Sequence, residues 1–140
     1  MTRSGRSTWL QPANAALLVR AVLVVVRIRL GLWVLPWSRV AAIVGRPRNT
    51  RSRLDVARLE RAVRLASRVV PFATCLTQAL ALNQLLSNNG HASTVLIGVR
   101  QDEGRFAAHA WVEWSGRTLL SSPAEVTQYS RFLTWPPRTT

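Results

Sequence analysis

The sequence contains no lysine, few acidic residues and a single cysteine. All nineteen basic residues are arginine, against six acidic residues, so the net charge is +13 at pH 7. One cysteine cannot form an internal disulfide, so we expect a protein of the reducing cytoplasm rather than a secreted one. One Cys and two His are too few for a zinc site, and the sequence has no glycine-rich phosphate loop, so we expect no metal and no other cofactor.

The positive charge is concentrated in the N-terminal half. Residues 1–70 hold fourteen arginines and two acidic residues, whereas residues 71–140 hold five and four. A basic region suits an acidic partner, such as nucleic acid, anionic lipid or an acidic protein. Genome composition with solvated arginines explains the bias equally well. We expect residues 1–70 to form a basic helical region that belongs to the same domain as a core in residues 71–140.

The first long apolar stretch, residues 13–35, predicts a helix. Arg20, Arg27 and Arg29 interrupt it, and each would cost about 2.5–3.5 kcal/mol near the centre of a bilayer. A helix that crosses a membrane is therefore disfavoured. Packing against the rest of the domain is the favoured alternative, and contact with a partner or a membrane surface is the other. Pro36 ends this helix.

A basic loop at residues 45–53 consists of turn-forming residues and arginines. We expect Arg48, Arg51 and Arg53 of this loop to bind a partner. A second amphipathic helix is predicted from Leu54 to about Val69, with arginines on one face and apolar residues on the other.

The C-terminal half predicts one helix followed by a small antiparallel sheet, and hence an α+β fold. The predicted elements are a helix at 75–88, strands at 93–99, 106–114 and 117–121, and a closing helix within 123–133. The dipeptide Ser115-Gly116 is a hairpin turn signal. In the 106–114 strand, His109 and Trp111 share one face, whereas Ala110 and Val112 share the other.

Cys75 and His109 are the candidates for chemistry. Cys75 begins a helix, where unpaired N–H groups favour a thiolate, and its own backbone N–H is a candidate oxyanion donor. His109 would act as general base and acid, and Trp111 would line the substrate cleft. The competing interpretation is a buried structural Cys and a structural His, both of which are common in proteins.

A larger set of residues carries a family resemblance: Cys75, Leu76, Leu80-Ala81-Leu82, Leu85-Leu86, Gly90, Leu96-Ile97-Gly98-Val99 and Ala108-His109-Ala110-Trp111-Val112-Glu113. Over roughly residues 70–132 the chain resembles the stand-alone, transglutaminase-like leader peptidase of lasso-peptide biosynthesis. The resemblance implies a papain-like or transglutaminase-like fold with Cys-His-Asp catalysis. It also implies cleavage of a precursor peptide that a small leader-binding protein presents. An ATP-dependent lasso cyclase is a further candidate partner, and no nucleic acid is expected.

The third catalytic position departs from the family pattern. The slot for an acidic residue holds Ser121 and Ser122, and the nearest acid beyond it is Glu125. Counting outward from a two-residue turn, His109 faces Ser122. Glu113 lies about 13 Å along the strand from His109 and is a poor orienting group.

Two alternatives to the peptidase stay open. The chain is either a weak or inactive basic adaptor with a vestigial Cys/His core, or another transglutaminase-like hydrolase or acyltransferase. The missing carboxylate and the basic N-terminal half favour the first of these.

Overall fold

The computed structural model describes residues 12–39, 54–70 and 73–135. The candidate partner-binding residues Arg48, Arg51 and Arg53 lie outside these ranges. The described elements are, in chain order, α2 (Pro12–Val34), α4 (Val56–Val69), α5 (Cys75–Asn88), β1 (Thr94–Asp102), β2 (Arg105–Trp114), β3 (Arg117–Leu119), α6 (Pro123–Val126) and β4 (Ser130–Trp135).

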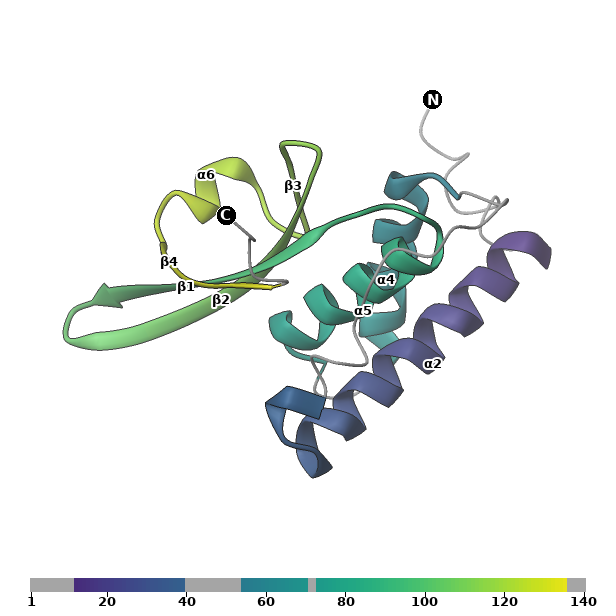
Figure 1. Ribbon diagram of the computed structural model, residues 1–140, viewed down its shortest axis with the longest axis horizontal. Helices are drawn as coiled ribbons and strands as arrows, with labels where there is room; N and C mark the ends of the chain where they lie inside the picture. The colour runs from purple at the N-terminus through teal and green to yellow at the C-terminus, as the bar shows by residue number, and fades with distance from the viewer. Residues whose placement is uncertain (1–11, 40–53, 71–72, 136–140) are drawn as a thin grey trace.

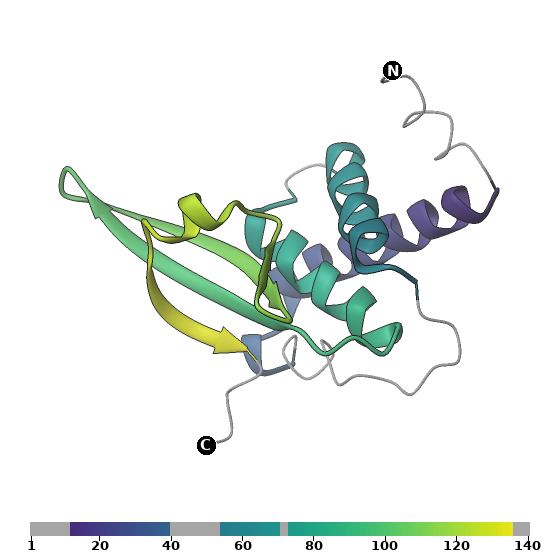
Figure 2. The ribbon, with the colours of Figure 1, turned by 90° about the horizontal axis from the view of Figure 1, so that it is seen from above.

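The fold is α+β, with a four-stranded antiparallel sheet on which α5 packs, while α2 and α4 pack against α5 and each other. Strand order is β3-β2-β1-β4, and α2, α4 and α5 lie together beside the sheet (Figures 1 and 2). The β1–β2 hairpin extends beyond the helices, and the short helix α6 lies on the other side of the sheet (Figure 1). The arrangement agrees with the fold class that the sequence predicts.

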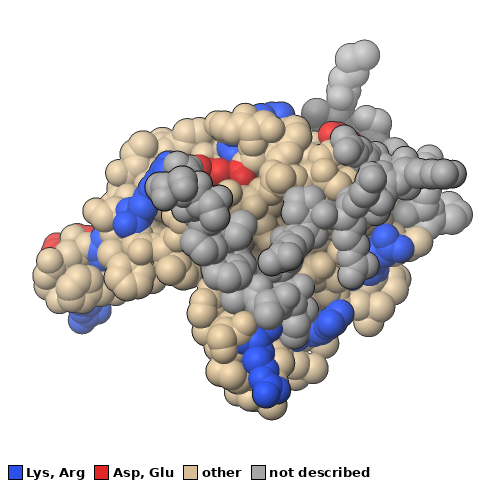
Figure 3. Space-filling model, viewed as in Figure 1, with Lys and Arg blue, Asp and Glu red and all other residues tan. Residues whose placement is uncertain are grey.

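Helix α2 packs through one side and leaves its opposite side exposed. Its core-facing residues recur every three or four positions and are Leu17, Ala21, Val25 and Ile28. The outer side carries exposed apolar residues, namely Val19, Leu23, Leu30, Trp33 and Val34. On the face drawn in Figure 3, arginines lie along α2, and the visible acidic side chains lie elsewhere. Among the described residues, none of the helices combines the length and hydropathy that crossing a bilayer requires.

Helix α5 is the centre of the core. Nine of its residues are buried, because it contacts α2 and α4 as well as β1 and β2. A helix that is apolar around its circumference belongs in such an interior. Its observed bounds, Cys75–Asn88, confirm the prediction for this helix. Gly90, at φ 77°, adopts the left-handed conformation that ends many helices.

The β2–β3 hairpin forms as the sequence predicts. Ser115 and Gly116 have φ values of 48° and 77°, which suits a two-residue turn with two positive φ angles. Trp114 pairs with Arg117, and Val112 pairs with Leu119. In the antiparallel β1–β2 pair, His109 of β2 lies opposite Gly98 of β1.

Two predictions for the C-terminal part are wrong. The third strand ends at Leu119 rather than Ser121, because Leu120 has a φ of 66° and leaves the extended conformation. The helix expected within 123–133 is only Pro123–Val126, and residues from Ser130 onward form β4 instead. Strand β4 pairs with the edge of β1 that would otherwise be open.

The second histidine, His91, follows α5 and contacts the main chain just before α4. Its ring is half-buried, and Nε2 lies 2.8 Å from the carbonyl oxygen of Leu54. The ring also meets Trp114 edge to face, with centroids 5.8 Å apart. His91 therefore joins the start of α4 to the end of β2 and is a structural residue.

Candidate active site

Cys75 is the first residue of α5 and is half-buried. The side chain of Thr74 caps the helix by accepting the N–H of Thr77 at 3.3 Å, and the Thr74 carbonyl accepts the N–H of Gln78 at 3.0 Å. Within the described residues, the N–H groups of Cys75 and Leu76 have no hydrogen-bond acceptor. Such first-turn amides can stabilise an anion, so the oxyanion role predicted for the Cys75 N–H stays a prediction with suitable local geometry.

His109 lies in the middle of β2, and its ring forms a cluster with two aromatic side chains, which also contact each other. The imidazole stacks on Trp111 at a centroid distance of 6.0 Å and contacts Tyr129 at 5.4 Å. Trp111 is only 1% exposed. The imidazole therefore stacks on a buried indole, and the cleft role expected for Trp111 stays a prediction.

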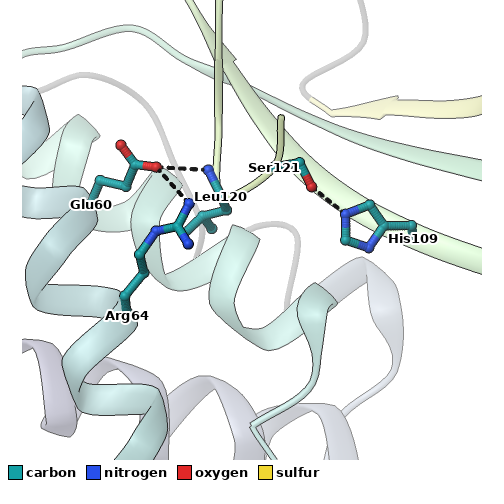
Figure 4. Close-up of polar contacts among 5 residues, drawn as sticks. All are labelled: Glu60, Arg64, His109, Leu120 and Ser121. Carbon is teal, nitrogen blue, oxygen red and sulfur yellow. Dashed lines mark hydrogen bonds and ion pairs between the residues drawn. The ribbon is translucent and has the colours of Figure 1, made fainter. Parts of the chain in front are cut away.

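The Nε2 atom of His109 is hydrogen-bonded to Oγ of Ser121 (Figure 4). The Oε1 atom of Glu125 lies 3.8 Å from the same nitrogen, and the Glu125 side chain is about half exposed. A half-exposed pair at that distance contributes little. Ser121 is thus the principal partner of Nε2 among the three candidates for the third position.

Ser122 does not face His109, contrary to the register expected from the hairpin. Its hydroxyl accepts the N–H of Glu125 at 3.1 Å and caps α6. The difference arises at Leu120, whose positive φ ends the regular pairing. Ser121 takes the place beside the imidazole instead.

A carboxylate that sequence reasoning missed holds this turn. Oε1 of Glu60, on α4, accepts the N–H of Leu120 at 2.9 Å and also pairs with Arg64 at 3.1 Å (Figure 4). A left-handed conformation costs a residue other than glycine about 1–3 kcal/mol, so Leu120 needs such support. Glu60 is sixty residues away in sequence, and no local pattern marks it.

The structure does not join the two predicted catalytic residues directly. No hydrogen bond between Sγ of Cys75 and the imidazole of His109 occurs in the described part of the chain. Ala110 and Val112 contribute to the core that contains α5. By the alternation of side chains along a strand, His109 projects from the other side of β2 than these two neighbours.

The acidic residue nearest along β2 is also engaged elsewhere. Oε1 of Glu113 pairs with Nη2 of Arg131 at 2.9 Å. Its carboxylate is therefore engaged with an arginine and does not orient His109. No group of three His, Cys, Asp or Glu side chains within residues 12–39, 54–70 and 73–135 could hold a metal ion.

Comparison with known proteins gives one match. A family model described as the transglutaminase-like superfamily matches residues 22–134. That span runs from within α2 into β4 and includes Cys75, His109 and Ser121. No curated protein and no solved structure matches the chain.

Proposed function

The chain belongs to the transglutaminase-like superfamily, and from this membership we propose that it is a cysteine peptidase that removes the leader from a lasso-peptide precursor. The superfamily fold is of the type found in cysteine-protease-like hydrolases and acyltransferases. The narrower assignment depends on the resemblance around Cys75 and the Ala108-to-Glu113 segment.

The observation that carries the proposal is the state of the His109 ring. Its Nε2 is held by Ser121, and within the described residues nothing bonds to Nδ1. A ring held at one nitrogen presents the other in a fixed orientation. The base role needs the tautomer in which Nε2–H donates to Oγ of Ser121 and Nδ1 carries the lone pair. The thiol of Cys75, at the start of α5, is the proposed proton donor to Nδ1.

The proposed reaction needs one contact that the described residues do not contain, between Sγ of Cys75 and Nδ1 of His109. Because His109 projects from the face of β2 opposite the core that contains α5, this contact requires the imidazole or the start of α5 to move. We assign that movement to the complex with the precursor.

In that complex, the Cys75 thiol transfers its proton to Nδ1 of His109, and the thiolate attacks the carbonyl carbon at the leader–core junction. The N–H of Cys75 stabilises the oxyanion. The imidazolium returns its proton to the departing amine of the core peptide, and the leader remains as a thioester. His109 then deprotonates a water molecule that hydrolyses the thioester and restores the thiol.

A second candidate is a protein with little or no peptidase activity that acts as a basic adaptor. Ser121 favours it, because a hydroxyl accepts a hydrogen bond from imidazole but does not neutralise imidazolium as a carboxylate does. An adaptor predicts a Cys75 that reacts with alkylating reagents no faster than a free thiol. It also predicts salt-sensitive binding to nucleic acid or anionic lipid.

A small leader-binding protein is the proposed partner, docking on the N-terminal helical region. The exposed apolar side of α2 supports this choice, since Leu23 is 64% and Leu30 is 58% exposed, and exposed apolar patches often mark interaction sites. Leu23→Glu with Leu30→Glu should weaken the complex in a binding titration. Reversal of charge at Arg48, Arg51 and Arg53 tests the basic loop in the same assay.

The deciding experiment is incubation of the protein with a precursor peptide and the leader-binding protein, followed by mass spectrometry. Release of the intact core by the wild type, and its loss in both Cys75→Ala and His109→Ala, is the expected result. Loss of the general base should lower the rate by about 10²–10⁴-fold. Undiminished cleavage by Cys75→Ala would refute the proposal.

A further inference from the structure

We propose that Glu60 is a positioning residue for His109, acting from α4 through Leu120 and Ser121. The inference rests on the proposed function only where it concerns activity. The chain of contacts itself can be tested without a substrate.

The first link joins two parts of the fold. Glu60 lies on α4 in the helical layer, and its Oε1 accepts the backbone N–H of Leu120 at 2.9 Å. The side chain of Glu60 is only 21% exposed, whereas that of its other partner, Arg64, is 53% exposed. The carboxylate is thus anchored between a helix and the end of β3, where competition from water is limited.

The second link is the conformation of Leu120. Its φ of 66° lies in the left-handed region, which a leucine adopts only when its surroundings impose it. Two features impose it here. The amide is held by Glu60, and the side chain packs against the hydrophobic core.

The third link is the direction in which Ser121 points. A strand continued past Leu119 would keep the alternating pattern of β3, in which Leu119 and Ser121 share a face. The left-handed residue between them breaks that pattern, and Oγ of Ser121 meets Nε2 of His109 instead. Figure 4 shows the two hydrogen bonds in sequence, from Glu60 to Leu120 and from Ser121 to His109.

The residue after Ser121 is also held in place. Ser122 caps α6 through the N–H of Glu125, so consecutive residues are held by α4, by β2 and by α6. Of these anchors, the Glu60 carboxylate is the one in the helical layer. Its removal frees the Leu120 amide and lets the turn relax away from the imidazole.

The test measures the imidazole signals of the full-length chain by ¹H–¹⁵N NMR at one fixed pH. The protein has only two histidines, so His91 serves as an internal reference. Glu60→Ala should shift the His109 Nε2 signal in the same direction as Ser121→Ala, and the double variant should shift it no further. Glu60→Gln keeps an acceptor oxygen and should shift it less. Arg64→Ala leaves the Leu120 bond in place and is the matched control.

An unchanged His109 signal in Glu60→Ala, beside a shifted one in Ser121→Ala, overturns the proposal. So does a shift in the double variant that equals the sum of the two single shifts. If Glu60→Ala does not fold, Glu60→Asp withdraws the carboxylate while keeping its charge, and the same two criteria apply.

With precursor peptide, Glu60→Ala and Ser121→Ala should each lower kcat about 10-fold with little change in KM. A wild type without peptidase activity would refute the proposed function and leave the NMR criteria in force.

Discussion

A Cβ atom on Gly98 would lie 2.7 Å from the Cβ of Tyr129, so these two residues pack with no room for a methyl group. The same atom would lie 2.8 and 2.9 Å from the indole of Trp111. Gly98 is also the β1 partner of His109. The glycine thereby allows Tyr129, in the segment after α6, to pack beside Trp111 and the imidazole.

Gly98→Ala should therefore lower stability by about 1–3 kcal/mol, as over-packing of a filled interior does. It should also reduce leader removal, since Tyr129 must move away from His109. Urea unfolding and a cleavage assay measure the two effects. Gly104→Ala is the control, because its Cβ would meet nothing within 4 Å and only its φ of 78° strains the variant. That control should lose stability but keep activity.

The hydroxyl of Ser121 should matter for rate more than for folding. Ser121→Ala is expected to lower kcat about 10-fold, which is less than loss of the general base itself. Ser121→Asp provides a carboxylate for the imidazolium and should raise kcat above the wild-type value. Steady-state kinetics on the precursor decide the matter, and equal rates in all three proteins would contradict the orienting role.

Glu125 should contribute little, although it is an acid near His109. Its oxygen is 3.8 Å from Nε2 and the side chain is 47% exposed, so water and salt screen the pair. Glu125→Gln is expected to change kcat by less than about 2-fold. A loss as large as that of Ser121→Ala would make Glu125 the third catalytic residue instead.

The cap of α5 should support both stability and the thiol. Thr74→Ala removes the acceptor for the N–H of Thr77 and should cost about 1 kcal/mol. Thr74→Ser keeps the oxygen and is the control. Thermal unfolding gives the stability, and the alkylation rate of Cys75 reports on the start of the helix. Identical melting curves for the two variants would argue against the cap.

The two sides of α2 should respond differently to the same substitution. Leu17 is 5% exposed and Leu23 is 64% exposed. Leu17→Ala should cost about 2–5 kcal/mol, whereas Leu23→Ala should stay within about 0.5 kcal/mol. Denaturant unfolding compares them directly. Equal effects would mean that α2 does not pack on the core as described.

Local patterns predicted much of the fold. The bounds of α5 follow from its apolar run and the residues on either side of it, Thr74 and Gly90. The alternation of β2 and the Ser115-Gly116 turn give the register of the hairpin. In each case the information lies within a few neighbouring residues, where propensity and periodicity act.

The parts that were missed depend on long-range contacts. The left-handed conformation of Leu120 depends on the contact with Glu60. No residue close to position 120 in the sequence indicates that conformation. Strand β4 forms because β1 offers an open edge, whereas the short sequence alone suggested a helix. The partner of His109 was therefore left open among three residues, and the turn at Leu120 decides for Ser121.

Cys75 can also serve as a natural labelling site that reports on the start of α5. It is the sole thiol, half-buried at the junction of a helix with the core, so each molecule can take up one label at one defined site. The speed of that uptake measures how often the first turn of α5 opens. Binding of a peptide or a partner nearby would register as a change in this speed, with no engineered probe.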